Sequence, residues 1–176
     1  VSLLAGDHFV WRQAGDMLAV VRAVHATPEY ARLPLAWYAR GDNAALASTY
    51  AIAEAARKGP SISAYALREG FVSFRQFLDR PVANEASYRL LEKDERERRF
   101  TAWDREIPFW YVPFDVLRVF DLPDLLAASP ASGTVLHAID GDWKRISPAA
   151  ARLLLPRTVS VVEAEQELVE RLLSNP

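Results

Sequence analysis

Short apolar runs alternate with segments of helical periodicity along most of this 176-residue chain. From residue 12 to residue 26, apolar side chains recur at the spacing of one helix face, and Thr27-Pro28 ends the run because a residue before proline avoids the helical region. The same reading predicts strands over residues 35–39, 62–67, 134–139 and 157–162, and helices over residues 43–57, 121–128, 147–155 and 163–173. Because strands and helices alternate, we expect an α/β fold: a mostly parallel sheet with helices on both faces, and ligands at the carboxyl ends of the strands.

Three of the predicted helices carry start signals. Asp42 or Asn43 is expected to cap the helix over residues 43–57. Asp121 is expected to cap the next helix, with Asp124 near the positive end of the helix dipole. Ser147-Pro148 opens the helix that follows, since proline is favoured in a first turn.

The middle of the chain, about residues 71–120, lacks a single clear period and is expected to be a mixed insertion within one domain that spans residues 1–176. Within it, residues 92–99 alternate acidic and basic side chains, which favours a solvated helix with pairs at i,i+4 spacing. Aromatic residues are dense from residue 100 to residue 120. Trp103, Trp110 and Tyr111 are candidates for stacking on sugar rings, although packing in the core or at an interface is the favoured interpretation.

Composition narrows the classes of function. The chain is 51% hydrophobic and 25% charged, which is ordinary for a globular protein, and its formal net charge of -2 favours neither nucleic acid nor anionic lipid as a partner. No apolar run approaches the ~20 residues of a membrane span. Cysteine is absent and the three histidines, His8, His25 and His137, are far apart in sequence, so we expect no metal site and no cofactor, and we interpret the histidines as structural. The sequence starts with Val1 instead of an initiator Met, and its first residues do not resemble a signal peptide. We therefore expect an excised or processed piece of a longer protein.

The stretch from Leu35 to Leu46 reads as a buried strand that turns sharply into a helix. This geometry exposes the catalytic serine of α/β hydrolases, in the pattern G-x-S-x-G. With Ala39 two residues before the apex, the serine position holds Gly41, which tolerates a strained turn but supplies no nucleophile. A register shifted by one residue makes Asp42 the nucleophile, but it places bulky Arg40 where the turn needs a small residue and leaves the general base lacking.

Several separated segments together resemble the α/β hydrolases related to acetyl xylan esterases and dienelactone hydrolases. The resemblance covers about residues 4–162. Its segments are the early helix with Trp11 and Asp16, the elbow-like residues 38–41, the pair Ser73-Phe74, residues 111–113, residues 116–126 with Phe120-Asp-Leu-Pro-Asp-Leu-Leu126 as the strongest piece, residues 135–140, and residues 145–147.

The resemblance implies the carboxyl-terminal half of a hydrolase domain whose amino-terminal half, with part of the oxyanion hole, is missing. The predicted strand over residues 35–39 would then lie at or near the truncated edge. This edge would pair with another strand or be covered by residues 1–10, because open edges recruit strands. The implied partners are the remainder of the parent hydrolase or a second copy of the chain, and the implied substrate class of intact relatives is a carbohydrate ester. The residues themselves do not indicate a location, and the resemblance alone suggests a secreted or periplasmic one.

The catalytic triad of the family is incomplete here. The acid position offers Asp140 or Asp142, although a turn role for Asp140-Gly141-Asp142 is the favoured interpretation. No histidine follows the last predicted strand, and we place His137 inside the strand over residues 134–139 rather than in the loop beyond it. We therefore expect a degenerate, non-catalytic structural or interaction module of a larger hydrolase. The alternative is part of an active carbohydrate esterase whose missing residues complete the site.

Overall fold

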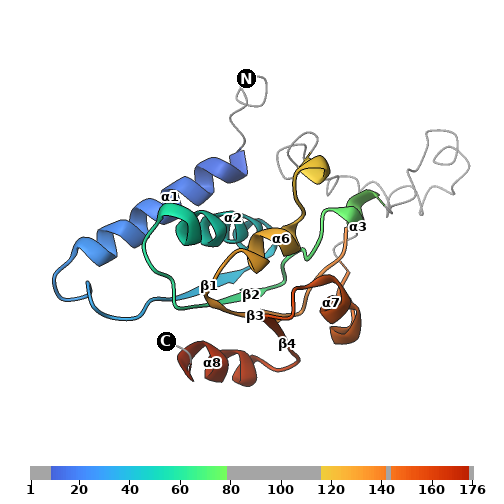
Figure 1. The fold of residues 1–176 in the computed structure, drawn as a ribbon. Helices are drawn as coiled ribbons and strands as arrows, with labels where there is room; N and C mark the ends of the chain where they lie inside the picture. The colour runs from blue at the N-terminus through green and yellow to red at the C-terminus, as the bar shows by residue number, and fades with distance from the viewer. Residues whose placement is uncertain (1–8, 79–115, 142–143, 175–176) are drawn as a thin grey trace, which may run out of the picture.

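The computed structural model describes residues 9–78, 116–141 and 144–174, which form an α/β fold (Figure 1). Its four-stranded sheet contains β1 (Ala36–Arg40), β2 (Ala64–Arg68), β3 (Ser132–Leu136) and β4 (Val159–Val162). All neighbouring strands are parallel and their order is β1-β2-β3-β4. The predicted α/β class and the parallel sheet are therefore confirmed. Within the described residues, β1 lies at an edge, where its strand partner is β2.

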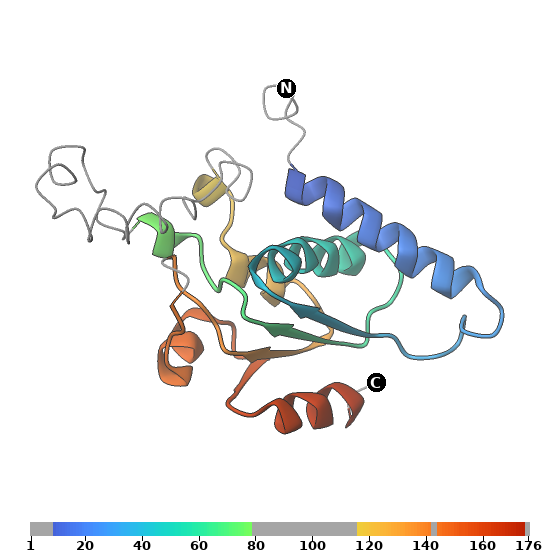
Figure 2. The ribbon, with the colours of Figure 1, turned by 180° about the vertical axis from the view of Figure 1, so that it is seen from behind.

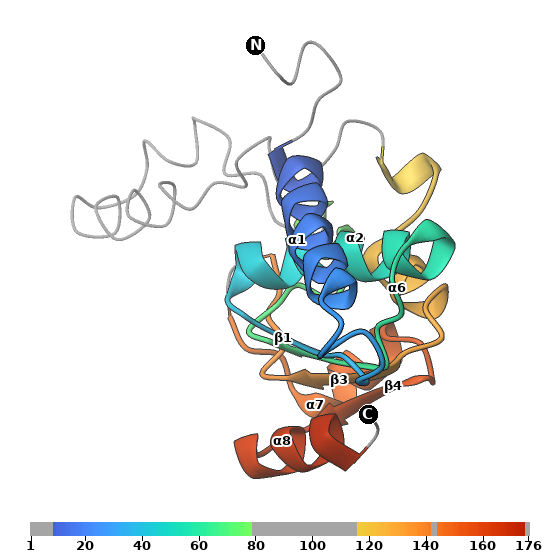
Figure 3. The ribbon, with the colours of Figure 1, turned by 90° about the vertical axis from the view of Figure 1, so that its left-hand side faces the viewer.

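Helices cover both faces of the sheet (Figures 2 and 3). On one face lie α1 (Phe9–Ala26), α2 (Asp42–Lys58) and α6 (Leu122–Ala127), whereas α8 (Glu165–Ser174) lies on the opposite face. The remaining described helices are α7 (Pro148–Leu154), which packs against β4, and the short α3 (Arg75–Leu78) and η1 (Val116–Arg118).

The two faces differ in the size of their cores. The larger core joins α1, α2 and α6 to the sheet, and α2 approaches closely because its buried face is rich in alanine. The smaller core consists of Ala66, Leu136, Val162 and Leu168, with Leu172 packed against it. Because the residues of β2 are buried on both faces, this strand reads as a continuous apolar run, as is typical of parallel sheets.

The third strand begins and ends earlier than its predicted range. It includes Gly133, where an added Cβ would overlap the hydroxyl oxygen of Tyr65 on the neighbouring strand. This close approach of an aromatic ring requires a residue without a side chain. The strand ends at Leu136 because His137 has a φ of 54°, which is incompatible with an extended backbone.

Asp121 joins the segment after β2 to the start of α6. Its carboxylate accepts hydrogen bonds from the Ser73 hydroxyl, from the backbone N–H of Phe74 at 2.7 Å and from that of Leu122 at 2.7 Å. The predicted cap at Asp121 is confirmed, and Asp124 lies in the first turn as expected, where it also completes a capping box by accepting from the backbone N–H of Asp121 at 2.8 Å. Since residues 79–115 lie outside the described residues, this clamp ties together the two described flanks of the predicted insertion.

Candidate functional site at the carboxyl ends of the strands

The turn between β1 and α2 has the predicted elbow geometry. Gly41 is its apex, with φ 94° and ψ 156°, a region of backbone conformation that is essentially restricted to glycine. Its N–H donates to the carbonyl of Arg68 at 2.9 Å, and its own carbonyl accepts the first helical hydrogen bond, from Ala45. The expected cap was wrong, because Gly41 is the N-cap of α2. Asp42 is the first helical residue and its carboxylate accepts from the backbone N–H of Asn43 at 2.8 Å.

Three neighbouring strands are each followed directly by a residue with a positive φ. Arg40 is paired with Arg68, and Arg68 with Leu136, so the residues that follow them lie side by side at the carboxyl edge of the sheet. These residues are Gly41, Glu69 and His137, with φ of 94°, 59° and 54°. Non-glycine residues rarely adopt such angles, and when they do they often lie at functional sites. The sheet edge where ligands are expected is thus also the place of local backbone strain.

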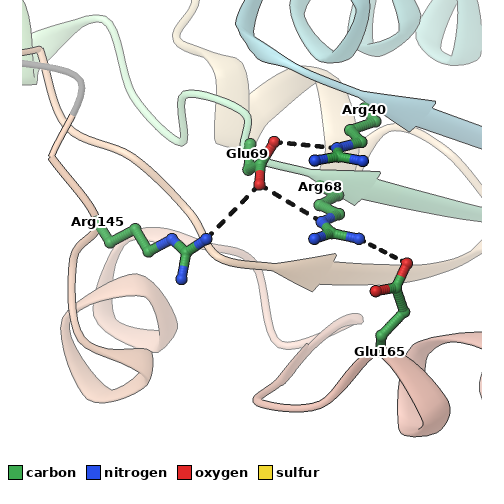
Figure 4. Close-up of polar contacts among 5 residues, drawn as sticks. All are labelled: Arg40, Arg68, Glu69, Arg145 and Glu165. Atoms are coloured by element: carbon green, nitrogen blue, oxygen red, sulfur yellow. Dashed lines mark hydrogen bonds and ion pairs between the residues drawn. The ribbon is translucent and has the colours of Figure 1, made fainter.

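Charged side chains gather at this edge in what we call the arginine–glutamate cluster (Figure 4). Glu69 lies at its centre, with its carboxylate oxygens 3.3 Å from Nε of Arg40, 3.5 Å from Nε of Arg68 and 3.6 Å from Nη2 of Arg145. Arg68 also bonds the carboxylate of Glu165, in the first turn of α8. The members of the cluster are therefore Arg40, Arg68, Glu69, Arg145 and Glu165, which come from β1, from β2 and the residue after it, from the loop after β3 and from α8.

The three guanidinium groups control the ionisation of Glu69. Partial burial acts to raise the pKa of this carboxyl, but the hydrogen bond from Arg40 and the charges of Arg40, Arg68 and Arg145 outweigh it and hold the pKa below its ordinary value of 4.5. Glu69 is therefore a carboxylate throughout the neutral range, and it offsets one of the three positive charges.

The sequence-based placement of His137 was wrong. It follows β3 instead of lying inside it, and its left-handed backbone directs the chain into a loop whose Ile139 bridges to Phe71. Its Nδ1 is buried and lacks a hydrogen-bond partner among the described residues. Desolvation, together with the charges of Arg145 and Arg68, lowers the pKa of His137 below 6.5, so the ring is neutral at pH 7.

Of the other candidate residues, Asp140 and His25 lie within the described ranges and five lie outside them. Asp140 has a turn role, because its backbone N–H donates to the carbonyl of Lys144 at 2.9 Å and its carboxylate accepts from the N–H of Lys144 at 3.0 Å. Its interpretation as a turn residue is supported by these bonds. His25 lies at the far end of α1, where its ring nitrogen lies 3.1 Å from the carbonyl of Ser61. The candidates His8, Trp103, Trp110, Tyr111 and Asp142 lie outside the described residues.

Sequence reasoning missed the arginine–glutamate cluster. A usable signal was present, because Arg40 and Arg68 occupy the last positions of two strands whose apolar runs were recognised. The partners Arg145 and Glu165 are 77 and 97 residues from Arg68 in sequence and carry no local pattern.

In the described part of the chain, no group of three His, Cys, Asp or Glu side chains is arranged to hold a metal ion. None of the described helices combines the length and the apolar character that crossing a membrane requires.

Comparisons with known proteins identify no relative. No protein-family model matches this chain, and no match was found among curated proteins or solved structures.

Proposed function

We propose that this chain is an α/β-hydrolase-like domain that has lost its catalytic machinery and serves as a structural or interaction module of a larger hydrolase. The observation that carries the proposal is the elbow: a strand, a strained apex and a helix are present, but the apex is Gly41. An elbow strains the backbone by about 1–3 kcal/mol, and an active hydrolase uses that strain to expose a nucleophile. Here the same backbone conformation persists, but glycine adopts it without steric strain and has no side chain to expose.

The remaining positions of the triad support the same interpretation. The residues after β4 are Glu163 and Ala164, followed by α8, and they include no histidine. Asp140, at the acid position, is engaged by Lys144. His137 follows β3 rather than β4, so it stands on a different strand from the catalytic histidine of the family.

The edge position of β1 supports the proposed partner. The strand pairs with β2 on one side, and its exposed residues include Tyr38 and Arg40. Unpaired N–H and C=O groups at an edge favour association with a further strand. We propose that this strand comes from the remainder of a hydrolase domain or from a second copy of the chain. A carbohydrate ester is the substrate class that the family resemblance suggests for the whole assembly.

Hydrolysis of nitrophenyl acetate and acetylated xylan tests the loss of catalysis. The purified chain is expected to show no turnover above the buffer rate, because the loss of general-base catalysis alone removes about 10²–10⁴ of rate. Gly41→Ser restores a hydroxyl at the apex but no base, and is expected to remain inactive. Saturable turnover that disappears in Asp42→Ala and persists in Asp124→Ala, a matched first-turn aspartate on α6, would refute the proposal in favour of an aspartate nucleophile.

A serine-hydrolase probe separates the module from the alternative of a divided active site. The probe is applied to this chain and to the longer polypeptide that the proposal implies. Labelling of neither, or labelling confined to a separate complete domain, agrees with a degenerate module. Labelling that requires residues of this chain would instead show that they complete an active esterase.

A further inference from the structure

The arginine–glutamate cluster has more cationic donors than its carboxylates use. Arg40 contacts Glu69 through Nε, and Arg145 contacts it through Nη2 at 3.6 Å, whereas each guanidinium carries five N–H donors in a planar fork. Both side chains are open to solvent, with exposed fractions of 59% and 60%. Arg68 is different, because only 13% of its side chain is exposed and Glu165 fixes its other end.

We propose that this cluster is a binding site for an oxyanion, the phosphate or carboxylate group of a small ligand. Arg68 forms its fixed floor, and Arg40 and Arg145 supply the accessible donors. Glu69 is an internal counter-ion that the ligand displaces or joins. Since guanidinium forks match the geometry of phosphate and carboxylate oxygens, both groups share the recognition chemistry.

The backbone at Glu69 supports a site more strongly than a surface ion pair would. Strand alternation places residue 69 on the opposite face from Arg40 and Arg68, which share a face through their register. The left-handed φ of 59° brings its carboxylate back to both arginines. A non-glycine residue in this conformation costs on the order of 1 kcal/mol or more, and such residues cluster at active sites and ligand clamps.

The position and the charge also favour an anionic ligand. The cluster lies at the carboxyl ends of parallel strands, beside His137, another non-glycine residue with positive φ, where α/β proteins bind ligands. Its three arginines and two glutamates leave one positive charge in a chain whose net charge is -2. Of the two glutamates, Glu165 is 60% exposed and, among the described residues, pairs with Arg68, so it does not neutralise the outer arginines. This inference does not rest on the hydrolase proposal, because neither the elbow nor the triad enters the argument.

Isothermal titration with sodium phosphate and with sodium acetate, at constant ionic strength held by sodium chloride, tests the site. We expect saturable binding of at least one anion, and the preferred anion identifies the group that the site recognises. Arg40→Gln and Arg145→Gln are each expected to weaken binding about tenfold, the loss of one charge-assisted hydrogen bond. Glu69→Gln removes the internal counter-ion and is expected to tighten binding about three- to tenfold, since a competing charge is lost.

Arg57→Gln provides a matched control. Arg57 is also 60% exposed and pairs with a glutamate, Glu54, but it lies in the last turn of α2, at the opposite end from Gly41. This variant should bind the anion as the unmodified chain does. Far-UV circular dichroism verifies that each variant is folded.

Two results would refute the proposal and leave the cluster as an ion-pair network. The first is that neither anion binds at up to about 20 mM, a concentration far above typical ligand dissociation constants. The second is that Arg57→Gln weakens binding as much as Arg145→Gln. If Glu69→Gln does not fold, the two exposed arginine variants still decide the question.

Discussion

Replacing Gly41 by alanine measures the strain that the elbow imposes on any residue with a side chain. An added Cβ at this position would meet no atom within 4 Å, so steric overlap does not contribute. The φ of 94° and ψ of 156° lie where a side chain is strained whatever the space, at about 1–3 kcal/mol. Alanine also restricts the unfolded chain, which favours folding by about 0.4–1 kcal/mol. We therefore expect Gly41→Ala to lower the free energy of unfolding by about 1–2 kcal/mol, the difference between these two effects.

Gly15 provides the control, because it has the same open space but an ordinary helical backbone. It lies on the exposed side of α1, and an added Cβ there also meets nothing within 4 Å. Gly15→Ala is expected to raise the free energy of unfolding by roughly 0.5–1 kcal/mol, since glycine is a poor residue inside a helix. The two substitutions add the same methyl group, so the difference between them reports the strain at the elbow.

Urea denaturation followed by circular dichroism measures both variants. With a slope of roughly 1–3 kcal/mol per molar urea, a difference of about 1.5–3 kcal/mol separates the two midpoints by about 1 M. Midpoints that move in the same direction by the same amount would contradict the reasoning, because a side chain at position 41 would then be no more strained than one in a helix. Such a result would also remove the main support for a hydrolase-like elbow.

Two further predictions concern Asp121 and His137. Asp121→Ala leaves the buried Ser73 hydroxyl and the Phe74 and Leu122 amides without their acceptor, so we expect a loss of about 3–5 kcal/mol in urea denaturation, against about 1 kcal/mol for Asp124→Ala; equal losses would show that the carboxylate acts only as a helix cap. Because the pKa of His137 is lowered on folding, the unfolded chain binds the proton more readily, and the stability associated with this residue is complete above pH 6.5 and is lost as the pH falls below it. His137→Asn, which tolerates a left-handed backbone, should lose less stability between pH 7.5 and 5.5 than the unmodified chain, and an unchanged pH profile would refute the assignment.

The sequence by itself was sufficient for the class of fold and for most of the element order. Four apolar runs and the helices between them were recognised because burial on both faces of a parallel sheet leaves a local and contiguous signal. Start signals succeeded where one side chain makes a short-range bond, as at Asp121 and Ser147. The elbow was also predictable, since a small residue between a strand and a helix is a local pattern.

Errors arose where a backbone angle, rather than a pattern of hydrophobicity, decided the outcome. The apolar residues after Leu136 continue the appearance of a strand, but the left-handed backbone at His137 ends it. Asp42 is a good capping residue by type, but Gly41 adopts the non-helical conformation and takes the cap position. At Gly41 the backbone N–H donates to the carbonyl of Arg68 on the neighbouring strand, a contact that exists only after the sheet has formed.

The arginine–glutamate cluster was decided by tertiary structure alone. Arg40 and Arg68 are adjacent through strand register. Arg145 lies on the loop after β3, and Glu165 lies on α8, which covers the face of the sheet opposite to α2. Local sequence specifies how a segment folds through short-range sterics and burial. The meeting of charges separated by up to 125 residues, from Arg40 to Glu165, depends instead on how parallel strands align their carboxyl ends, which no single segment encodes.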